Sequence, residues 1–210
     1  MRYLALGDSY TIGTSVSAGE RWPNQLVARL AAEAAAAGRE PPIDLVGNPA
    51  VNGFTTRDVI AVELPELARL RPEVLSLLIG TNDVIQGIDE DRYRRNLEVI
   101  LDAIDSAAPP VRVFGVSTPD YTVTPAGGDY GDPAVQSARL GRYNAIFGEA
   151  LAARRIAVVD IHDISLEAAH DRSLVATDGL HPSGLQYGRW VERILPVVAR
   201  LLATAQLSGR

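Results

Sequence analysis

Short apolar segments alternate along the chain with longer segments of helical period. The apolar segments are residues 3–6, 44–46, 74–79, 111–116 and 156–159, and the first three are each followed directly by a glycine. Segments of this length that are apolar at nearly every position are typical of parallel strands covered on both faces. We therefore predict a sheet of about five mainly parallel strands.

The segments that connect and follow these strands carry apolar residues every three or four positions, as amphipathic helices do. The predicted helices span residues 22–37, 89–107, 134–154 and 182–203, with one more that Thr55 or Thr56 caps and that continues into a second turn at Pro65. Pro182 suits the first turn of the last helix, and Pro196 should kink that helix. The alternation predicts one three-layer α/β domain over residues 1–210, with ligands bound beyond the carboxyl ends of the strands.

One long irregular stretch interrupts this alternation at residues 117–133, which include three prolines and three glycines. A loop of this length in a compact domain is usually functional or mobile. It follows the fourth predicted strand, so we expect Tyr121 and Tyr130 to help form the wall of a pocket.

Polar residues gather where the predicted strands end. Residues 7–9 and 80–83 directly follow the first and third strands, residues 52–53 follow the second after a short loop, and residues 178–182 precede the last helix. The carboxyl ends of parallel strands share one edge of a sheet, so we expect these four loops to meet at one site.

The residue types in these loops match the needs of acyl transfer. Ser9 can act as a nucleophile if a base accepts its proton, and His181 can be that base. Asp178 precedes His181 by three positions, close enough to orient the imidazole ring. The backbone N–H groups of Ser9 and Gly53 and the Asn82 side chain are candidate donors to the oxyanion.

Each loop also has a purely structural interpretation. Ser9 could only cap a helix, Asn82 and Asp83 could cap another, and Asn52-Gly53 could be an ordinary turn. The coincidence of all four loops at one sheet edge favours the catalytic interpretation. We expect Asp8 and Asp83 to hold loop backbones.

Composition narrows the chemistry further. The chain has 210 residues, 47% of them hydrophobic, and a formal net charge of −6. It contains no cysteine and three histidines, which excludes thiolate nucleophiles and Cys-ligated metals and argues against a multi-His metal site. The acidic balance argues against a nucleic-acid partner. Of the other histidines, we expect His162 to satisfy local turn hydrogen bonds and His170 to lie on a solvated surface.

Targeting signals are not visible in the sequence. The apolar segment after Met1 is too short for a signal peptide, and no segment approaches the roughly 20 apolar residues of a membrane span. We expect a cytoplasmic protein without stable membrane insertion, or a secreted one if an N-terminal segment was removed. The oligomeric state is not readable from the sequence.

Four motifs carry a family resemblance that spans nearly the whole chain. Residues 7–10 (Gly-Asp-Ser-Tyr), 52–53 (Asn-Gly), 80–83 (Gly-Thr-Asn-Asp) and 178–182 (Asp-Gly-Leu-His-Pro) resemble the four sequence blocks of the SGNH/GDSL hydrolases, in the family's order. The resemblance implies a flavodoxin-like sheet of order 2-1-3-4-5. Tyr10 departs from the leucine that the family name leads one to expect.

The resemblance implies, for each of these residues, the same role that the requirements of acyl transfer suggested above. It makes Ser9 the nucleophile and first oxyanion donor, and Gly53 and Asn82 the other two donors. His181 is then the base and Asp178 its partner. No metal or organic cofactor is implied.

The expected function is hydrolysis of small carboxylic esters, with short or medium acyl chains favoured. Thioester, lysophospholipid and acetylated-carbohydrate hydrolysis are alternatives on the same site. A catalytically silent α/β binding module and a phosphoester hydrolase are rivals from other classes, and the second would need a metal or basic site that the histidine count disfavours.

Overall fold

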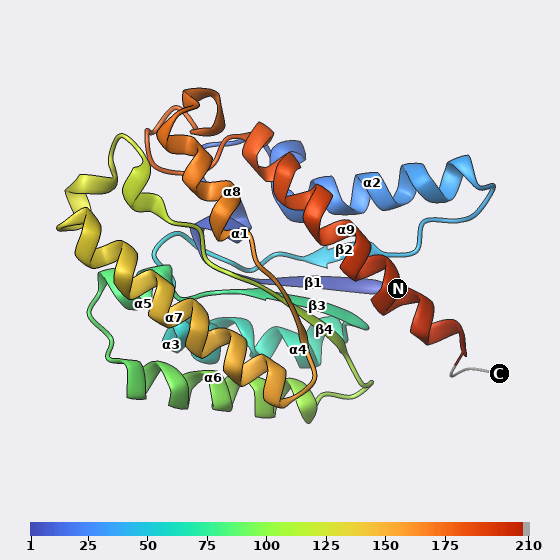
Figure 1. Ribbon diagram of the computed structural model, residues 1–210. Coiled ribbons are helices and arrows are strands. Elements are labelled where there is room, and N and C mark those ends of the chain that lie inside the picture. Colours follow the sequence, from blue (N-terminus) through green and yellow to red (C-terminus); the bar gives the residue numbers. More distant parts are fainter. Residues whose placement is uncertain (208–210) are drawn as a thin grey trace.

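The computed structural model describes residues 1–207 and contains one five-stranded parallel sheet (Figure 1). The strands are β1 (Arg2–Gly7), β2 (Asp44–Gly47), β3 (Val74–Leu78), β4 (Arg112–Val116) and β5 (Ala157–Val159). Their spatial order is β2-β1-β3-β4-β5, and each neighbouring pair is parallel. The predicted α/β fold and strand order are confirmed.

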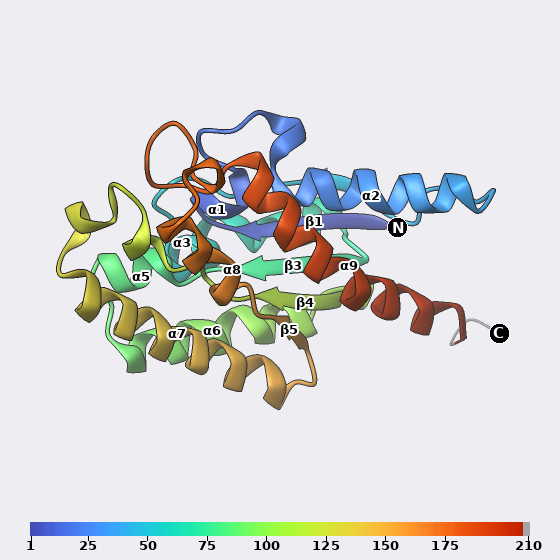
Figure 2. The ribbon, with the colours of Figure 1, turned by 45° about the horizontal axis from the view of Figure 1, so that its top comes forward.

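Helices cover both faces of the sheet (Figure 2). One face packs against α2 (Trp22–Ala36) and α9 (Gly184–Leu207). The other packs against α4 (Pro65–Leu70), α6 (Glu90–Asp105) and α7 (Pro133–Ala153).

Strand β1 shows why both layers form. Tyr3 and Ala5 point into one apolar core, Leu4 and Leu6 into the other, and all four are fully buried. A strand with apolar residues on both faces requires a helical layer on each side, which gives the three-layer arrangement that the apolar runs predicted.

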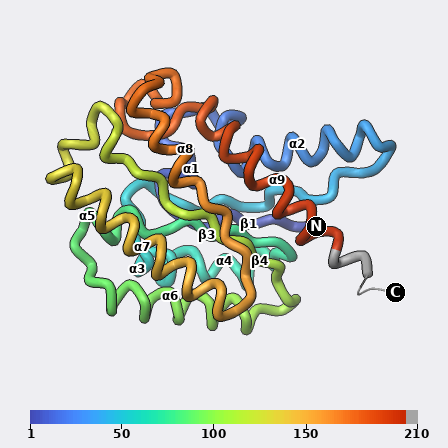
Figure 3. Tube along the Cα trace, in the orientation of Figure 1, coloured from blue at the N-terminus to red at the C-terminus, as the bar shows by residue number. Residues whose placement is uncertain are grey.

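Short helices occupy the strand ends, and the sequence pattern missed several of them. They are α1 (Ser9–Ile12), α3 (Thr56–Asp58), α5 (Thr81–Ile85) and α8 (His162–Leu166), with a π-helical turn at Val59–Glu63 between α3 and α4. Thr55 is the N-cap of α3, and Pro65 opens α4, as expected. Figure 3 follows the chain from β1 and β3 into α1 and α5, at the end of the sheet away from Met1.

The prediction that Pro182 opens the last helix is wrong. Helix α9 begins at Gly184, and Pro182 forms an antiparallel bridge with Val175 instead. The backbone on either side is paired across the same hairpin, because Ala176 N donates to His181 O at 2.7 Å and Ser183 N donates to Leu174 O at 2.8 Å. Residues 174–183 therefore form a tight hairpin, which we call the dyad hairpin.

Candidate active site

Ser9 is the first residue of α1, immediately beyond the carboxyl end of β1. Asp8 is the N-cap of this helix, and its Oδ1 accepts a hydrogen bond from Tyr10 N at 3.0 Å. The alternative that Ser9 serves only as a helix cap is therefore wrong. The Ser9 hydroxyl therefore does not cap α1, and only 3% of the residue surface is exposed.

Gly7 allows the close approach of chain segments on which this arrangement depends. A Cβ at this position would overlap the Leu78 carbonyl oxygen of β3 and the Thr11 hydroxyl of α1. Only glycine therefore lets α1 begin directly at the end of β1.

Asp178 and His181 form a hydrogen-bonded pair at the tip of the dyad hairpin. His181 Nδ1 lies 2.6 Å from Asp178 Oδ2, while Asp178 Oδ1 accepts from the backbone N–H groups of Leu180 and His181 at 2.9 and 3.0 Å. Partial burial would raise the pKa of Asp178, but hydrogen bonds from Ser15, Leu180 and His181 hold that pKa well below its usual range. The ionised carboxylate fixes the proton on Nδ1 and leaves Nε2 to act as a base.

The ring of Tyr10 connects the dyad hairpin to the nucleophile helix. Its centroid lies 5.4 Å from the His181 ring and 6.5 Å from the ring of Trp190 on α9. Tyr10 is 3% exposed, and His181 is 6% exposed. Tyr10 directly follows Ser9 in the sequence, so this contact places the His181 ring beside helix α1.

The two other predicted oxyanion donors are Gly53 and Asn82, in the loops that follow β2 and β3. Asn82 Nδ2 donates to Phe54 O at 3.0 Å and lies 3.4 Å from Asp8 Oδ2, so the Asn82 amide lies between the residue after Gly53 and the residue before Ser9. Gly53 has a φ of +86°, and apart from its chain neighbours no atom of the described residues lies within 4 Å of the position that a Cβ would take. Asn82 is not a helix cap, because Gly80 is the N-cap of α5.

Three carboxyl groups are fully buried beside these loops: Asp8, Glu63 and Asp83. Burial raises the pKa of Asp8 to about 8 and that of Asp83 to about 6. As expected, both hold loop backbones: Asp83 accepts from Thr56 N at 3.0 Å, and Asp8 caps α1.

Glu63 was not anticipated from the sequence. Its Oε2 accepts a hydrogen bond from Gly7 N at 2.9 Å, its Oε1 has no hydrogen-bond partner among residues 1–207, and burial raises its pKa to about 9. An acidic residue in an amphipathic segment normally indicates a solvent-exposed position. The π-helical turn at Val59–Glu63 changes the phase of the helix and directs this side chain inward.

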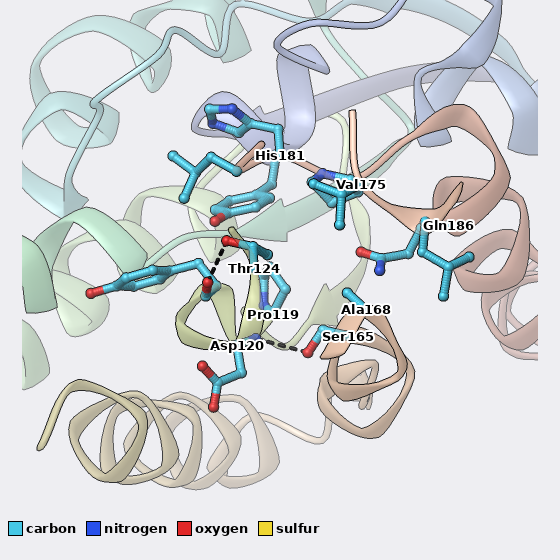
Figure 4. A pocket seen from close by; sticks show the side chains of 13 residues that line it. Pro119, Asp120, Thr124, Ser165, Ala168, Val175, His181 and Gln186 are labelled. Carbon is cyan, nitrogen blue, oxygen red and sulfur yellow. Dashed lines mark hydrogen bonds between the residues drawn. The ribbon is translucent and has the colours of Figure 1, made fainter. Parts of the chain in front are cut away.

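The stretch of residues 117–133 is less irregular than predicted, because it contains 3₁₀ turns at Tyr121–Val123 and Gly127–Tyr130. It packs on the dyad hairpin, where Ala126 N donates to Gly179 O at 2.9 Å. A narrow pocket lies between these two segments and α8, and Figure 4 shows Gln186 pointing toward Pro119 and Thr124 in it. Residues 119, 120, 121 and 124 line this pocket together with His181.

The remaining histidines lie outside this arrangement. His170 is exposed, as expected. His162 begins α8 and makes local hydrogen bonds as expected, because its N–H donates to Asp160 and its carbonyl oxygen accepts from Ser165; among the described residues its buried Nδ1 has no hydrogen-bond partner. Within residues 1–207, no three His, Asp or Glu side chains are grouped to hold a metal ion, and no helix has the length and apolarity needed to cross a membrane.

Solved structures of similar fold are esterases and related enzymes. A family 3 carbohydrate esterase from Clostridium thermocellum matches with a TM-score of 0.73 and 20% identity, covering 98% of each chain. The psychrotrophic esterase EstA from Pseudoalteromonas sp. matches with a TM-score of 0.71 and 17% identity, covering 96% of this chain and 98% of that one. TesA matches with a TM-score of 0.71 and 21% identity over 96% and 99% of the two chains.

No curated protein matches this chain significantly in sequence. The model of the GDSL-like lipase/acylhydrolase family, in contrast, matches residues 5–189, which include all four of the loops described above. The family and the esterases of similar fold support hydrolase activity of the esterase type. The chain belongs to the GDSL-like lipase/acylhydrolase family.

Proposed function

We propose that the protein is a serine hydrolase that cleaves carboxylic esters through an acyl-enzyme on Ser9. The observation that carries the proposal is the bond between an ionised Asp178 and His181 Nδ1, on a hairpin whose histidine ring packs against the neighbour of Ser9. This arrangement supports a base of defined tautomer next to α1, whose first residue, Ser9, does not cap the helix.

In the first half-reaction His181 Nε2 accepts the Ser9 proton as Oγ attacks the acyl carbonyl carbon. The developing oxyanion receives hydrogen bonds from the N–H groups of Ser9 and Gly53 and from the Asn82 amide. Collapse of the tetrahedral intermediate breaks the bond to the alcohol oxygen, which leaves with the proton held by His181.

In the second half-reaction water attacks the acyl carbon and transfers a proton to His181. The intermediate collapses to release the acid, and the proton returns to Ser9. The ionised Asp178 stabilises the imidazolium that forms in both half-reactions and keeps its proton on Nδ1.

Esters of short or medium acyl chains are the substrates that we favour. Residues 117–133, which pack on the dyad hairpin, carry charge only as the carboxylates Asp120, Asp129 and Asp132, which disfavours a polyanionic substrate. Thioesters, lysophospholipids and acetylated carbohydrates are alternatives, and the carbohydrate and acetyl xylan esterases among the proteins of similar fold make acetylated sugars the first of these to test.

The test is hydrolysis of p-nitrophenyl esters from acetate to palmitate by the wild type and by Ser9→Ala. We expect kcat to fall about 10⁴- to 10⁶-fold in the variant, and a fluorophosphonate probe to label Ser9 in the wild type only. Ser17→Ala, a change to a serine after α1, is the matched control and should retain activity. Equal hydrolysis by the wild type and Ser9→Ala would exclude Ser9 as nucleophile, and a folded wild type that neither hydrolyses esters nor reacts with the probe would favour a binding module.

A further inference from the structure

Ser15 lies in the loop that follows the nucleophile helix, and its backbone conformation is unusual. Its φ is +66°, a left-handed value that residues with a side chain rarely adopt. Gly13, two residues earlier, is the left-handed C-cap of α1. Left-handed residues other than glycine persist where the surrounding structure holds them, and they concentrate at functional sites.

The side chain of Ser15 contacts the predicted base pair directly. Ser15 Oγ donates to Asp178 Oδ2 at 2.6 Å, across 163 positions of sequence. The same oxygen lies 2.6 Å from His181 Nδ1. With the two backbone N–H groups on Oδ1, the Asp178 carboxylate accepts four hydrogen bonds, and Ser15 supplies the only one from outside the dyad hairpin within the described part of the chain.

We propose that Ser15 is a positioning residue for the proposed esterase reaction: its hydroxyl holds the Asp178 carboxylate in the orientation that directs Oδ2 at His181. This inference rests on the proposed function, because it assigns Ser15 a role only if His181 is the base. Asp178 needs such support because 29% of its side chain is exposed, and water would otherwise compete for Oδ2.

The hydrogen bond between Ser15 and Asp178 also joins two segments of the site that lie far apart in the sequence. Ser15 follows α1, which carries Ser9, whereas Asp178 and His181 lie on the dyad hairpin. A hydrogen bond between them restrains the hairpin relative to the nucleophile helix. Ser17 shows that the role is specific to position 15, because its hydroxyl bonds instead to Glu20 of the neighbouring 3₁₀ turn, at 2.7 Å.

The test replaces Ser15 by glycine, which removes the hydroxyl and readily adopts the left-handed backbone. We expect kcat for p-nitrophenyl ester hydrolysis to fall about 10-fold, as for loss of one hydrogen bond to a charged group, with KM unchanged and the melting temperature not lowered. Arg71→Gly is the matched control, because Arg71 also has a left-handed φ, +44°, and lies at the end of α4. That control should leave kcat unchanged.

Two further measurements separate positioning from a purely structural role. In an Asp178→Ala background, Ser15→Gly should no longer slow fluorophosphonate labelling, because its target carboxylate is gone. In the otherwise wild-type protein, Ser15→Gly should shift the downfield proton NMR resonance of the His181 Nδ1–H. Ser15→Asn, which tolerates a left-handed φ and retains a donor, should recover part of the lost kcat.

The inference is overturned if Ser15→Gly retains full kcat, or if it slows labelling equally with and without Asp178. If Ser15→Gly does not fold, a Ser15→Asn variant with no more activity than Ser15→Ala overturns it as well. Failure of the proposed function has a different signature, since Ser9→Ala would then keep the activity of the wild type whatever Ser15 does.

Discussion

The substitution Glu63→Gln tests whether the buried carboxyl group beside the nucleophile loop has a raised pKa in the folded protein. The side chain is fully buried, one oxygen accepts from Gly7 N, and burial raises its pKa to about 9, so the group is protonated at pH 7. Glutamine keeps an acceptor for the Gly7 N–H and has a similar shape. Unlike the Glu63 carboxyl, the glutamine side chain does not titrate, so it binds no proton that could be lost as the pH rises.

The sign and size of the effect follow from proton linkage. Between its ordinary pKa of 4.5 and the folded value near 9, Glu63 binds a proton in the native state but not in the unfolded chain. The stability this confers is complete below the lower value and is lost as pH rises, by up to about 1.4 kcal/mol per pH unit. From pH 6 to pH 8 the free energy of unfolding of the wild type should therefore fall by up to about 2.7 kcal/mol more than that of Glu63→Gln.

Urea unfolding at pH 6, 7 and 8 measures this difference, with tryptophan fluorescence as the probe. Trp22 and Trp190 are both fully buried, so unfolding exposes both rings. The charge of Asp8 also raises the pKa of Glu63, so the difference between the two proteins reports Glu63 together with its coupling to Asp8. Glu149→Gln, at an exposed carboxylate on α7, controls for the effect of replacing a glutamate by glutamine on the unfolded chain. Parallel pH dependences for the wild type and Glu63→Gln would refute the reasoning.

Two further substitutions test the roles of residues at the carboxyl ends of the strands. Asn82→Ala should lower kcat for ester hydrolysis by on the order of 10²–10³ with little change in KM, because in the proposed mechanism its amide donates to the transition-state oxyanion; a higher KM at constant kcat would instead indicate a role in substrate binding. Gly7→Ala should lower the free energy of unfolding by about 1–3 kcal/mol in urea titrations, because its methyl group would overlap the Leu78 carbonyl oxygen and the Thr11 hydroxyl, and an unchanged unfolding midpoint would contradict that overlap.

The sheet and the four loops were predictable because their causes are local. Apolar runs of three to six residues indicate buried strands, and the glycines after the first three runs indicate where those strands end. Asp178 and His181 are three positions apart, so their pairing follows from a single turn. The connectivity of a parallel sheet then places every strand end at one edge.

Other features depend on tertiary structure and were missed for that reason. Glu63 faces inward because a π-helical turn changes the helix phase, and no composition pattern marks such a turn. Ser15 reaches Asp178 across 163 positions, from a backbone conformation in which serine is uncommon. Pro182 was assigned to a helix from its intrinsic preference, but the pairing of Val175 with Pro182 in the dyad hairpin decided its conformation.

The pairing of Asp178 with His181 on one turn has a consequence for how this chain can vary in length. Ser9, Gly53 and Asn82 each lie just beyond a separate strand, so inserting residues into the helices between them leaves their relative positions set by the sheet. The three-residue spacing from Asp178 to His181 has no such tolerance, since one added residue would separate the two side chains. Insertions and deletions should therefore accumulate at the far ends of the connecting helices and be absent from the tip of the dyad hairpin.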